Sequence, residues 1–362
     1  MLRIVHIDTG RDLRGGQRQL LLLAAGIRES GHGQVIVCPE GSALDHRAAA
    51  DGFRVFALPA HDLGHAHGLL QLRQLLLSEP WQILHAHDGR GQTLAWLASL
   101  GMPVRRVASR RVTFLPDTRA RHRFIYTRTC HAVIAISEFI KGLLIKSGVP
   151  ERKIEVIPDG IEIPAGLPTA ETRARARRGW RFAEKDFVVG HVGSFTEEKG
   201  QDTAIAAMAP VLARLPQAHL LLAGDGPRWA SLEASAKGSA IRAAIHLPGR
   251  VENLSEFFAA LDLYIMPSRA EGLGSSALLA MAHGLAVVAS RVGGLPEVVT
   301  EGETGWLVPP NSPQALAASI IHAASDRGRL AQFGSAARQA ARRFSSDIMR
   351  ARTEALYRRL GM

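Results

Sequence analysis

Residues 266–276 read Met-Pro-Ser-Arg-Ala-Glu-Gly-Leu-Gly-Ser-Ser and connect an apolar strand to an apolar helix. The preceding run, Leu261–Met266, is typical of a buried parallel strand, and Ser275–His283 is typical of a helix, which Gly284 ends. A buried strand followed by a short loop and a helix is the repeating unit of parallel α/β sheets. The stretch therefore predicts an α/β fold.

The loop within this stretch combines one carboxylate, Glu271, with the glycines Gly272 and Gly274 and the hydroxyl residues Ser275 and Ser276. Glycine lets the backbone approach a ligand closely, and the free N–H groups at the start of a helix attract anions. A carboxylate beside an anion site suits a ligand with hydroxyls at one end and phosphate at the other. A nucleotide sugar is such a ligand.

Length and composition predict a globular protein of two domains. The chain has 362 residues, 46% of them hydrophobic and 21% charged, which is too long for one ordinary core and does not favour disorder. Met1–Ile7 begins like a strand rather than a signal peptide, and the apolar run Leu20–Ile27 is too short to span a bilayer. The two cysteines, Cys38 and Cys130, suit a reducing compartment. We therefore expect a cytoplasmic protein.

The net charge of +11 predicts contact with an anionic partner. Arginines are concentrated in one segment of the first half, which contains Arg105, Arg106, Arg110, Arg111, Arg119, Arg121, Arg123 and Arg128 against the single carboxylate Asp117. The segment is either a solvated basic surface or a site for an anionic acceptor, for which Arg110 and Arg111 are the candidates. Only 6% of residues are aromatic, which argues against a stacking platform for nucleic acid.

Strands and helices are expected to alternate in both halves of the chain. The expected strands are Arg3–Ile7, Gln34–Cys38, Arg54–Leu58, Ile83–His87, Val104–Ser109, Ala132–Ile136, Phe187–Val192, His219–Ala223, Ile245–Leu247, Leu261–Met266 and Ala286–Ser290. The expected helices are Gln17–Ser30, Gly68–Ser78, Gly91–Leu100, Ser137–Ser147, Glu171–Arg181, Gly200–Leu215, Arg228–Gly238, Leu254–Ala260, Ser275–His283 and Ser346–Leu360. This rhythm predicts doubly wound parallel sheets with ligands at the carboxyl ends of the strands.

The rhythm is interrupted once, at a segment rich in turn residues. Ile157–Pro164 contains two prolines and an Asp-Gly pair, which suits a hinge. We therefore expect a first domain over residues 1–163, a second over 164–343, and a terminal amphipathic helix over 344–362 that packs back on the first domain.

Short motifs in a fixed order give the chain a family resemblance. They are Gly15–Gln17, Ile83–His87, Ile134–Glu138, Val156–Ile161, Val192–Gly200, Ala223–Pro227, Pro267–Gly274, Val292–Val299 and Gly302–Gly305. With these motifs, the chain resembles the retaining GT-B glycosyltransferases of family 4 over essentially its full length. The resemblance implies two facing Rossmann-like domains, with the nucleotide-sugar donor held mainly by the second and the acceptor met by the first.

The resemblance also implies roles for particular residues. Lys199 would neutralise the departing diphosphate, Glu271 would contact hydroxyls of the donor sugar, and the strand-end His87 would contact the donor sugar or the reacting centre. Asp88 is a weaker candidate, and His85 suits a structural role. The full set of expected donor contacts is Gly15, Gly16, Ser194, Lys199, Arg250, Glu271, Gly272, Leu273, Gly274, Ser275, Ser276 and Leu279.

Two positions depart from the family pattern. The family's second glutamate, which holds the ribose hydroxyls, is replaced by Leu279, and the arginine that often stands five residues before the lysine is replaced by Ser194. Losing a charge-assisted hydrogen bond commonly costs about 1–3 kcal/mol. The departures predict weaker donor binding or a different grip on the nucleotide.

The motifs favour one function over two alternatives. The leading hypothesis is a metal-independent retaining transferase, without a cofactor, that moves a hexose from a UDP- or GDP-linked sugar to a glycan or glycolipid of the bacterial envelope, such as lipopolysaccharide. The sequence contains no Asp-x-Asp pair, which other glycosyltransferases use to hold a metal. The alternative is a degenerate relative that binds nucleotide or a partner with little turnover. An NAD-dependent oxidoreductase would need Gly-x-Gly-x-x-Gly after the first strand, which Arg14–Gln17 does not supply.

Overall fold

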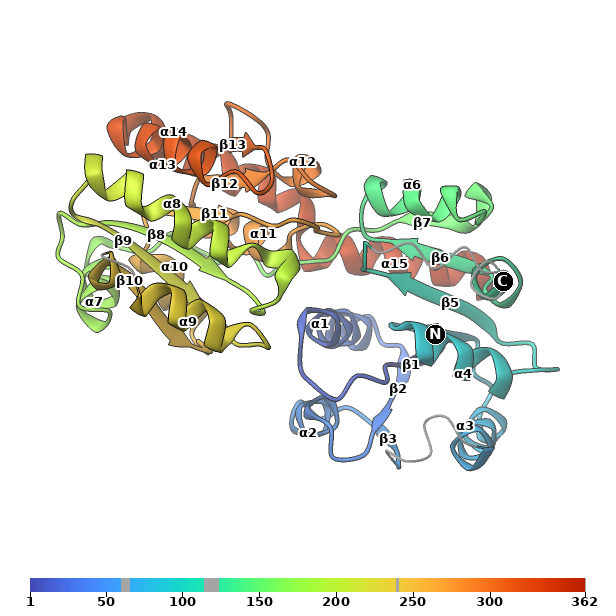
Figure 1. The fold of residues 1–362 in the computed structure, drawn as a ribbon. Coiled ribbons are helices and arrows are strands. Elements are labelled where there is room, and N and C mark those ends of the chain that lie inside the picture. The colour runs from blue at the N-terminus through green and yellow to red at the C-terminus, as the bar shows by residue number, and fades with distance from the viewer. Residues whose placement is uncertain (60–65, 114–123, 239–240, 362) are drawn as a thin grey trace. The chain divides into compact units, whose positions relative to one another are not determined.

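The computed structural model describes residues 1–59, 66–113, 124–238 and 241–361. The chain forms two compact α/β units (Figure 1). Unit 1 comprises Met1–Gly160 together with Ser346–Met362, and unit 2 comprises Ile161–Ser345. The chain thus leaves unit 1 near the expected hinge and returns to it with its last helix.

Unit 1 is built on a parallel sheet of seven strands in the order β3-β2-β1-β4-β5-β6-β7. The strands are β1 (Arg3–Ile7), β2 (Gly33–Pro39), β3 (Val55–Leu58), β4 (Ile83–Ala86), β5 (Arg105–Arg110), β6 (Ala132–Ala135) and β7 (Ile154–Val156). The helices are α1 (Gly15–Glu29), α2 (Ala43–Ala50), α3 (Ala66–Ser78), α4 (Gly89–Ala98), α6 (Glu138–Lys146) and α15 (Ser346–Gly361), with the single turns η1 (Ile125–Thr129) and η2 (Glu151–Lys153).

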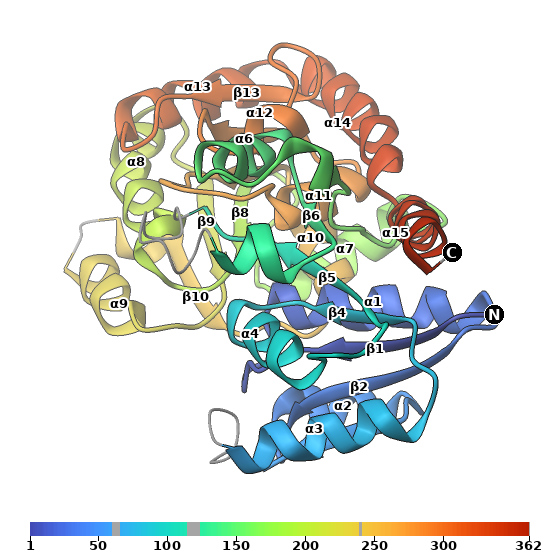
Figure 2. The ribbon, with the colours of Figure 1, turned by 90° about the vertical axis from the view of Figure 1, so that its right-hand side faces the viewer.

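Alternation along the strands of unit 1 supplies two apolar faces. On β1, Ile4 packs with residues of α1 and α15, whereas Val5 and Ile7 pack with residues of α3 and α4. The terminal helix α15 lies alongside α1 (Figure 2), and Tyr357 of α15 is fully buried. The prediction that the C-terminal helix returns to the first domain is therefore confirmed.

Unit 2 contains a parallel sheet of six strands in the order β10-β9-β8-β11-β12-β13. The strands are β8 (Phe187–Val192), β9 (Ala218–Ala223), β10 (Ile245–Gly249), β11 (Leu263–Met266), β12 (Val287–Ser290) and β13 (Gly305–Val308). The helices are α7 (Ala170–Gly179), α8 (Gln201–Arg214), α9 (Trp229–Lys237), α10 (Leu254–Ala260), α11 (Ser275–Ala282), α12 (Leu295–Val298), α13 (Pro313–Ser325) and α14 (Arg327–Ala341), with the turns η3 (Glu197–Lys199), η4 (Arg242–Ala244) and η5 (Arg342–Phe344).

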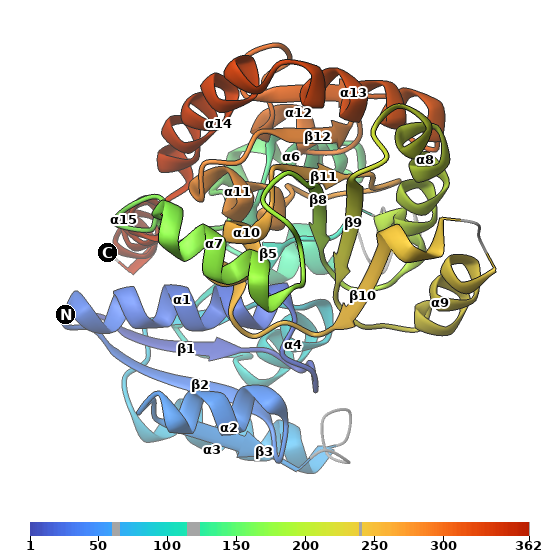
Figure 3. The ribbon, with the colours of Figure 1, turned by 90° about the vertical axis from the view of Figure 1, so that its left-hand side faces the viewer.

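Helices cover both faces of the second sheet as well. Side chains of α8, α9, α13 and α14 join the core formed by alternate residues of β8, β9 and β11, and α8 and α13 lie side by side (Figure 3). A buried carboxylate next to β11 links two helices of unit 2: Asp262 pairs with Arg173 and Arg177 of α7 and with Arg327 of α14. It also accepts a 2.7 Å hydrogen bond from the backbone N–H of Val188. Burying a carboxylate needs such compensation.

The two doubly wound parallel sheets confirm the predicted fold class, and most expected elements are present within a few residues. One expected boundary was wrong: the helix expected to begin at Gln17 begins at Gly15, so Gly15 and Gly16 are the first residues of α1 and do not form a loop before it. Six further helices and strands were not expected from the sequence, namely α2, β7, α12, β13, α13 and α14. None of the described helices combines the length and the apolar character needed to cross a bilayer.

Candidate functional site

The order of strands in unit 2 singles out one edge of its sheet. The chain proceeds from β8 to β9 on one side and later returns to β11 on the other side of β8, so β8 and β11 are neighbours with diverging connections. Ligands of open α/β sheets bind at the carboxyl ends of such strands. Lys199 follows β8 and Glu271 follows β11, which places both predicted residues at this switch point.

Close backbone packing joins the segment that carries Lys199 to the loop that carries Glu271. Gly200 has φ +67°, and a Cβ on it would lie 2.1 Å from the carbonyl oxygen of Pro267. The backbone N–H of Arg269 donates a 2.7 Å hydrogen bond to the carbonyl of Glu198. Only glycine allows this approach without strain. The two segments therefore form one rigid surface.

On this surface the ammonium of Lys199 contacts the carboxylate of Glu271, with Nζ 2.6 Å from Oε2. Their side chains are 22% and 12% exposed, so both are partly shielded but reachable from solvent. A charge pair with this degree of burial is held in a definite geometry, and shielding strengthens the attraction between its members relative to a pair in water. The structure thus brings together two residues that the sequence separates by 72 positions.

A second loop holds Glu271 from the other side. The backbone N–H of Gly294 donates a 3.1 Å hydrogen bond to the carbonyl of Glu271. Gly293 has φ +57°, and a Cβ on it would lie only 1.8 Å from that same carbonyl oxygen. The backbone of Glu271 is therefore fixed by a glycine pair that tolerates no side chain.

The start of α11 provides unpaired backbone donors next to Glu271. Gly274 is the N-cap, with φ +104°, and no side chain caps the helix. The first N–H groups of an α-helix have no partner within the helix, and the helix dipole adds partial positive charge there. Ser275 and Ser276 open the helix, and Leu279 lies half-buried one turn further on. This end of α11 suits an anion.

The remaining predicted donor contacts are placed as follows. Leu273 is buried. Gly272 packs against Gly294, since a Cβ on Gly294 would lie 2.4 Å from the carbonyl oxygen of Gly272. Ser194 follows β8, and its carbonyl accepts a 2.9 Å hydrogen bond from the side chain of Gln201. Arg250 follows β10, is mostly exposed, and lies 3.5 Å from a carboxylate oxygen of Asp225. Their roles in donor binding stay predictions.

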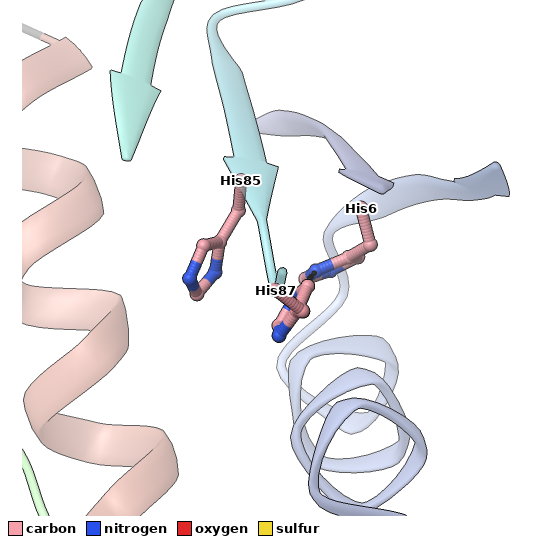
Figure 4. A group of neighbouring side chains, drawn as sticks. All are labelled: His6, His85 and His87. Atoms are coloured by element: carbon pink, nitrogen blue, oxygen red, sulfur yellow. Dashed lines mark hydrogen bonds between the residues drawn. The ribbon is translucent and has the colours of Figure 1, made fainter. Parts of the chain in front are cut away.

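Unit 1 has its own switch point, between β1 and β4, and it is lined by histidines. His6 lies on β1 opposite His85 on β4, and His87 follows β4 with its N–H donating to the carbonyl of Ile7 at 2.8 Å. The three rings lie on one face of the sheet (Figure 4). Nδ1 of His6 is 3.1 Å from Nε2 of His87.

The surroundings keep these imidazoles neutral. Burial lowers the pKa of His6 to about 4, although its contact with Gln34 acts in the opposite direction. Burial also lowers the pKa values of His85 and His87 well below the ordinary value, with smaller contributions from neighbouring histidines and Arg111. Removing an imidazolium from water costs more than removing the neutral ring. Each ring therefore carries one N–H and one lone pair at neutral pH.

Two of the candidates at this edge have structural partners. His85 is bonded through one nitrogen to Ser109 Oγ at 2.8 Å and through the other to Tyr357 Oη at 2.5 Å. Asp88 caps α4 by accepting a 2.9 Å bond from the N–H of Gly91. Burial and the nearby Asp8 raise the pKa of Asp88. His87 differs from them, because its Nδ1 is buried and no group of the described residues bonds it.

The two arginines predicted to bind the acceptor substrate lie in different surroundings. Arg110 ends β5 and is buried, with Nη1 3.2 Å from the hydroxyl of Tyr126. Arg111 lies near Gly16 at the start of α1, and its Nε donates to Asp159 at 2.9 Å. Four residues of the predicted basic segment lie outside the described part of the chain: Asp117, Arg119, Arg121 and Arg123. Acceptor binding by the arginines stays a prediction.

One group of residues in the described ranges lies close enough to surround a metal ion. One ring nitrogen from each of His6, His85 and His87 lies within 4.8 Å of the others. However, both nitrogens of His85 already have oxygen partners, and the positive charge of Arg111 acts on two of the rings. The group is therefore poorly suited to a cation, and the prediction of metal independence stays a prediction.

Sequence reasoning missed residues that shape both sites through backbone or long-range contacts. It named His6 only as part of a strand, although a histidine near the end of the first strand was a usable signal. The roles of Gly293, Arg269 and Asp159 had no local signal beyond membership in a motif or loop. Their partners lie far away in the sequence, so the contacts could be found only in the folded chain.

Comparison with known proteins gives matches along both halves. Residues 172–340 match the family described as glycosyl transferases group 1, and residues 13–163 match glycosyltransferase family 4. The chain is 28% identical over 351 residues to a GDP-mannose-dependent alpha-(1-6)-phosphatidylinositol monomannoside mannosyltransferase of Mycolicibacterium smegmatis. The aligned region covers 90% of this chain and 90% of that protein.

Solved structures show the same fold. HepE of Anabaena, crystallised with UDP-glucose, has a TM-score of 0.88 and 22% identity, with 98% of this chain and 99% of that chain covered. WaaG, a glycosyltransferase involved in lipopolysaccharide biosynthesis, has a TM-score of 0.75 and 18% identity, with coverage of 98% and 99%. The GT-B fold predicted from the sequence motifs is confirmed.

Proposed function

Because this chain is a GT-B glycosyltransferase of family 4, group 1, we propose that it moves a hexose from a nucleoside-diphosphate sugar to a glycan or glycolipid, with retention of configuration and without a metal. The observation that carries the proposal is the contact between Lys199 and Glu271 beside the open start of α11, at the switch point of unit 2. This arrangement offers a cation and amides for phosphate and a carboxylate for sugar hydroxyls.

The chemistry follows from the charge that develops during transfer. The bond between the anomeric carbon and the phosphate oxygen breaks, so negative charge grows on the diphosphate. Lys199 and the amides at the start of α11 stabilise that charge, and preorganised donors of this kind are effective because they need not reorient. Glu271 holds the hydroxyls of the sugar and so orients the anomeric carbon.

Retention requires attack from the face that the leaving group occupies or a covalent intermediate. A covalent route would need a carboxylate nucleophile next to the anomeric carbon. Glu271 is paired with Lys199 in the described structure, and this pairing favours a holding role. We infer a front-face route, in which the acceptor oxygen bonds the anomeric carbon and its proton passes to the departing phosphate oxygen.

Donor screening followed by a transfer assay tests the proposal. Purified protein would be titrated with UDP- and GDP-linked hexoses in a thermal-shift assay, since a ligand stabilises the state that binds it. Transfer or slow hydrolysis of the donors that bind would then be measured, with and without EDTA. Tight nucleotide binding without turnover on any donor would favour the degenerate-relative alternative, which the replacements at Leu279 and Ser194 suggest.

Replacing Leu279 by glutamate is expected to tighten nucleotide binding. Leu279 lies on α11, one turn after the anion-binding end, at the position where the resemblance places a ribose-binding carboxylate. A hydrogen bond to a charged group contributes about 1.5–3 kcal/mol, which corresponds to a roughly 10- to 150-fold lower Kd. Calorimetry with UDP and GDP measures the change. A Kd equal to that of the unmodified chain would show that the ribose lies elsewhere.

The acceptor is proposed to be a glycolipid of the bacterial envelope, reached from an anionic membrane surface. The mannosyltransferase relative and WaaG support this by their names, and the net charge of +11 supports attraction to anionic lipid. On α6 of unit 1, Phe139 and Ile145 are 37% and 41% exposed and accompany the basic residues Lys141 and Lys146. Apolar and basic groups together suit a membrane interface.

Binding to vesicles is expected to require anionic lipid and to weaken with salt. The attraction between basic residues and lipid phosphate is screened over about 10 Å at 0.1 M ionic strength. Sedimentation with phosphatidylglycerol vesicles, with neutral phosphatidylcholine vesicles as control, at 50 mM and 500 mM NaCl measures it. Indifference to both salt and lipid charge would contradict membrane docking.

A further inference from the structure

His6 and His87 form a buried polar contact at the carboxyl ends of β1 and β4 in unit 1. The proposed reaction does not by itself require this contact. Both residues are buried, one on β1 and the other just after the neighbouring β4. Their nitrogens Nδ1 and Nε2 are 3.1 Å apart, a normal hydrogen-bond length. Buried polar contacts of this kind fix orientation, because an unpaired group there costs free energy.

Two arrangements of protons allow a hydrogen bond between the two rings. They differ in whether Nδ1 of His87 can accept or donate a further hydrogen bond. In the first, Nε2–H of His87 donates to Nδ1 of His6, and Nδ1 of His87 keeps a bare lone pair. In the second, Nδ1–H of His6 donates to Nε2 of His87, and Nδ1 of His87 carries the proton. Both rings are neutral at pH 7, so these two tautomers exhaust the possibilities.

Gln34 on β2 selects the first arrangement. Its amide nitrogen donates to the carbonyl of Ala24 at 2.6 Å, which leaves the amide oxygen as the group available to His6. Among the described residues, neither that oxygen nor Nε2 of His6 has a hydrogen bond of ordinary geometry, and both are shielded from solvent. Gln34 nevertheless acts on His6, because its side chain raises the pKa of that imidazole. An acceptor beside Nε2 favours a proton on Nε2 of His6, so that Nδ1 of His6 must accept. The proton of the contact then belongs to Nε2 of His87.

We propose that His6 is a positioning residue that holds His87 in its Nε2–H tautomer, so that Nδ1 of His87 accepts a hydrogen bond from a sugar hydroxyl. Within the described part of the chain, Nδ1 of His87 has no hydrogen-bond partner, and neither has Nη1 of Arg111, whose charge acts on His87. A hydroxyl can donate to the imidazole while it accepts from a guanidinium. The inference deepens the proposed function, because it assumes that His87 meets a carbohydrate.

Spectroscopy of the ligand-free protein tests the tautomer without relying on activity. Long-range ¹H–¹⁵N spectra of the full chain with ¹⁵N-labelled histidine distinguish protonated from bare ring nitrogens, and His87→Gln identifies the signals of His87. We expect a proton on Nε2 and none on Nδ1. A proton on Nδ1 of His87 in the unmodified chain, or about one metal ion per chain by elemental analysis, would overturn the inference.

Variants of the supporting residues test the positioning role. His6→Leu removes the acceptor and should leave His87 in a mixture of tautomers, whereas His6→Asn offers a carbonyl oxygen near the position of Nδ1 and should restore the Nε2–H form. Gln34→Met removes the amide oxygen next to Nε2 of His6. It should change the tautomer population of His87 in the same direction as His6→Leu. A His87 tautomer that is unchanged in both His6→Leu and Gln34→Met would contradict the role of His6.

Kinetics complete the test. His6→Leu is expected to lower kcat/KM of hexose transfer roughly fivefold to tenfold, the effect of about one neutral hydrogen bond, with recovery in His6→Asn. Full kcat/KM in His6→Leu, alongside a loss in His87→Gln, would overturn the positioning role. If the unmodified protein transfers no sugar at all, the proposed function fails, while the spectra still decide the tautomer. Melting temperatures of each variant confirm that it folds.

Discussion

Replacing Lys199 by alanine is expected to lower kcat of hexose transfer about 100- to 1,000-fold, the range seen when one preorganised donor to a developing anion is removed. The ammonium is held 2.6 Å from the carboxylate of Glu271, so its position is set before the donor arrives. Lys199→Ala removes the cation and also leaves Glu271 without its partner. Lys199→Arg keeps the charge and should retain more activity than the alanine variant. Initial rates at saturating donor measure the loss.

A double-mutant cycle examines whether the two residues act as a unit. Residues in direct contact show coupling energies of about 0.5–3 kcal/mol. Lys199→Ala combined with Glu271→Gln should therefore lose less activity than the product of the two single losses. The matched control is Lys237→Ala, which breaks another lysine–glutamate pair of unit 2, 2.7 Å from Glu233 on the exposed side of α9. Unchanged turnover in Lys199→Ala and Glu271→Gln would reject this site.

Replacing Gly293 by alanine is expected to lower kcat/KM about 100-fold without touching any charged group. The new Cβ would lie 1.8 Å from the carbonyl oxygen of Glu271, so one of the two loops must move. A shift of about 1 Å in a group that orients the substrate can cost 100-fold in rate. The Kd of the donor, measured by calorimetry, should rise as well, because Glu271 leaves the sugar hydroxyls.

A second glycine separates this effect from ordinary backbone strain. Gly302 also has a positive φ, +73°, but a Cβ on it would meet no atom within 4 Å. Gly302→Ala should therefore lower the free energy of unfolding by about 1–2 kcal/mol, the cost of a side chain in the left-handed region, and leave transfer intact. Equal kinetic losses in the two variants would show that strain, and not displacement of Glu271, is responsible.

Much of the fold could be predicted because it depends on local patterns. The buried run Phe187–Val192 and the helix Leu254–Ala260 appear with the expected bounds, and the helix expected from Ser137 is α6, which has Ser137 as its N-cap. Prediction was weaker where the pattern has more than one solution. Gly15 and Gly16 suit a turn in isolation, yet they lie in the first turn of α1, which begins at Gly15. There the side-chain oxygen of Gln17 accepts a 3.1 Å hydrogen bond from the backbone N–H of Arg14.

The sequence by itself determined which chemical groups stand at the ends of which strands, because side-chain periodicity and turn residues act over a few positions. It therefore named Lys199, Glu271 and His87 and the parallel sheets that carry them. Only the tertiary structure decided which of these groups meet. The contact of Lys199 with Glu271 spans 72 positions and that of His6 with His87 spans 81. Such contacts depend on strand order and on glycine-mediated loop packing, which no local pattern encodes.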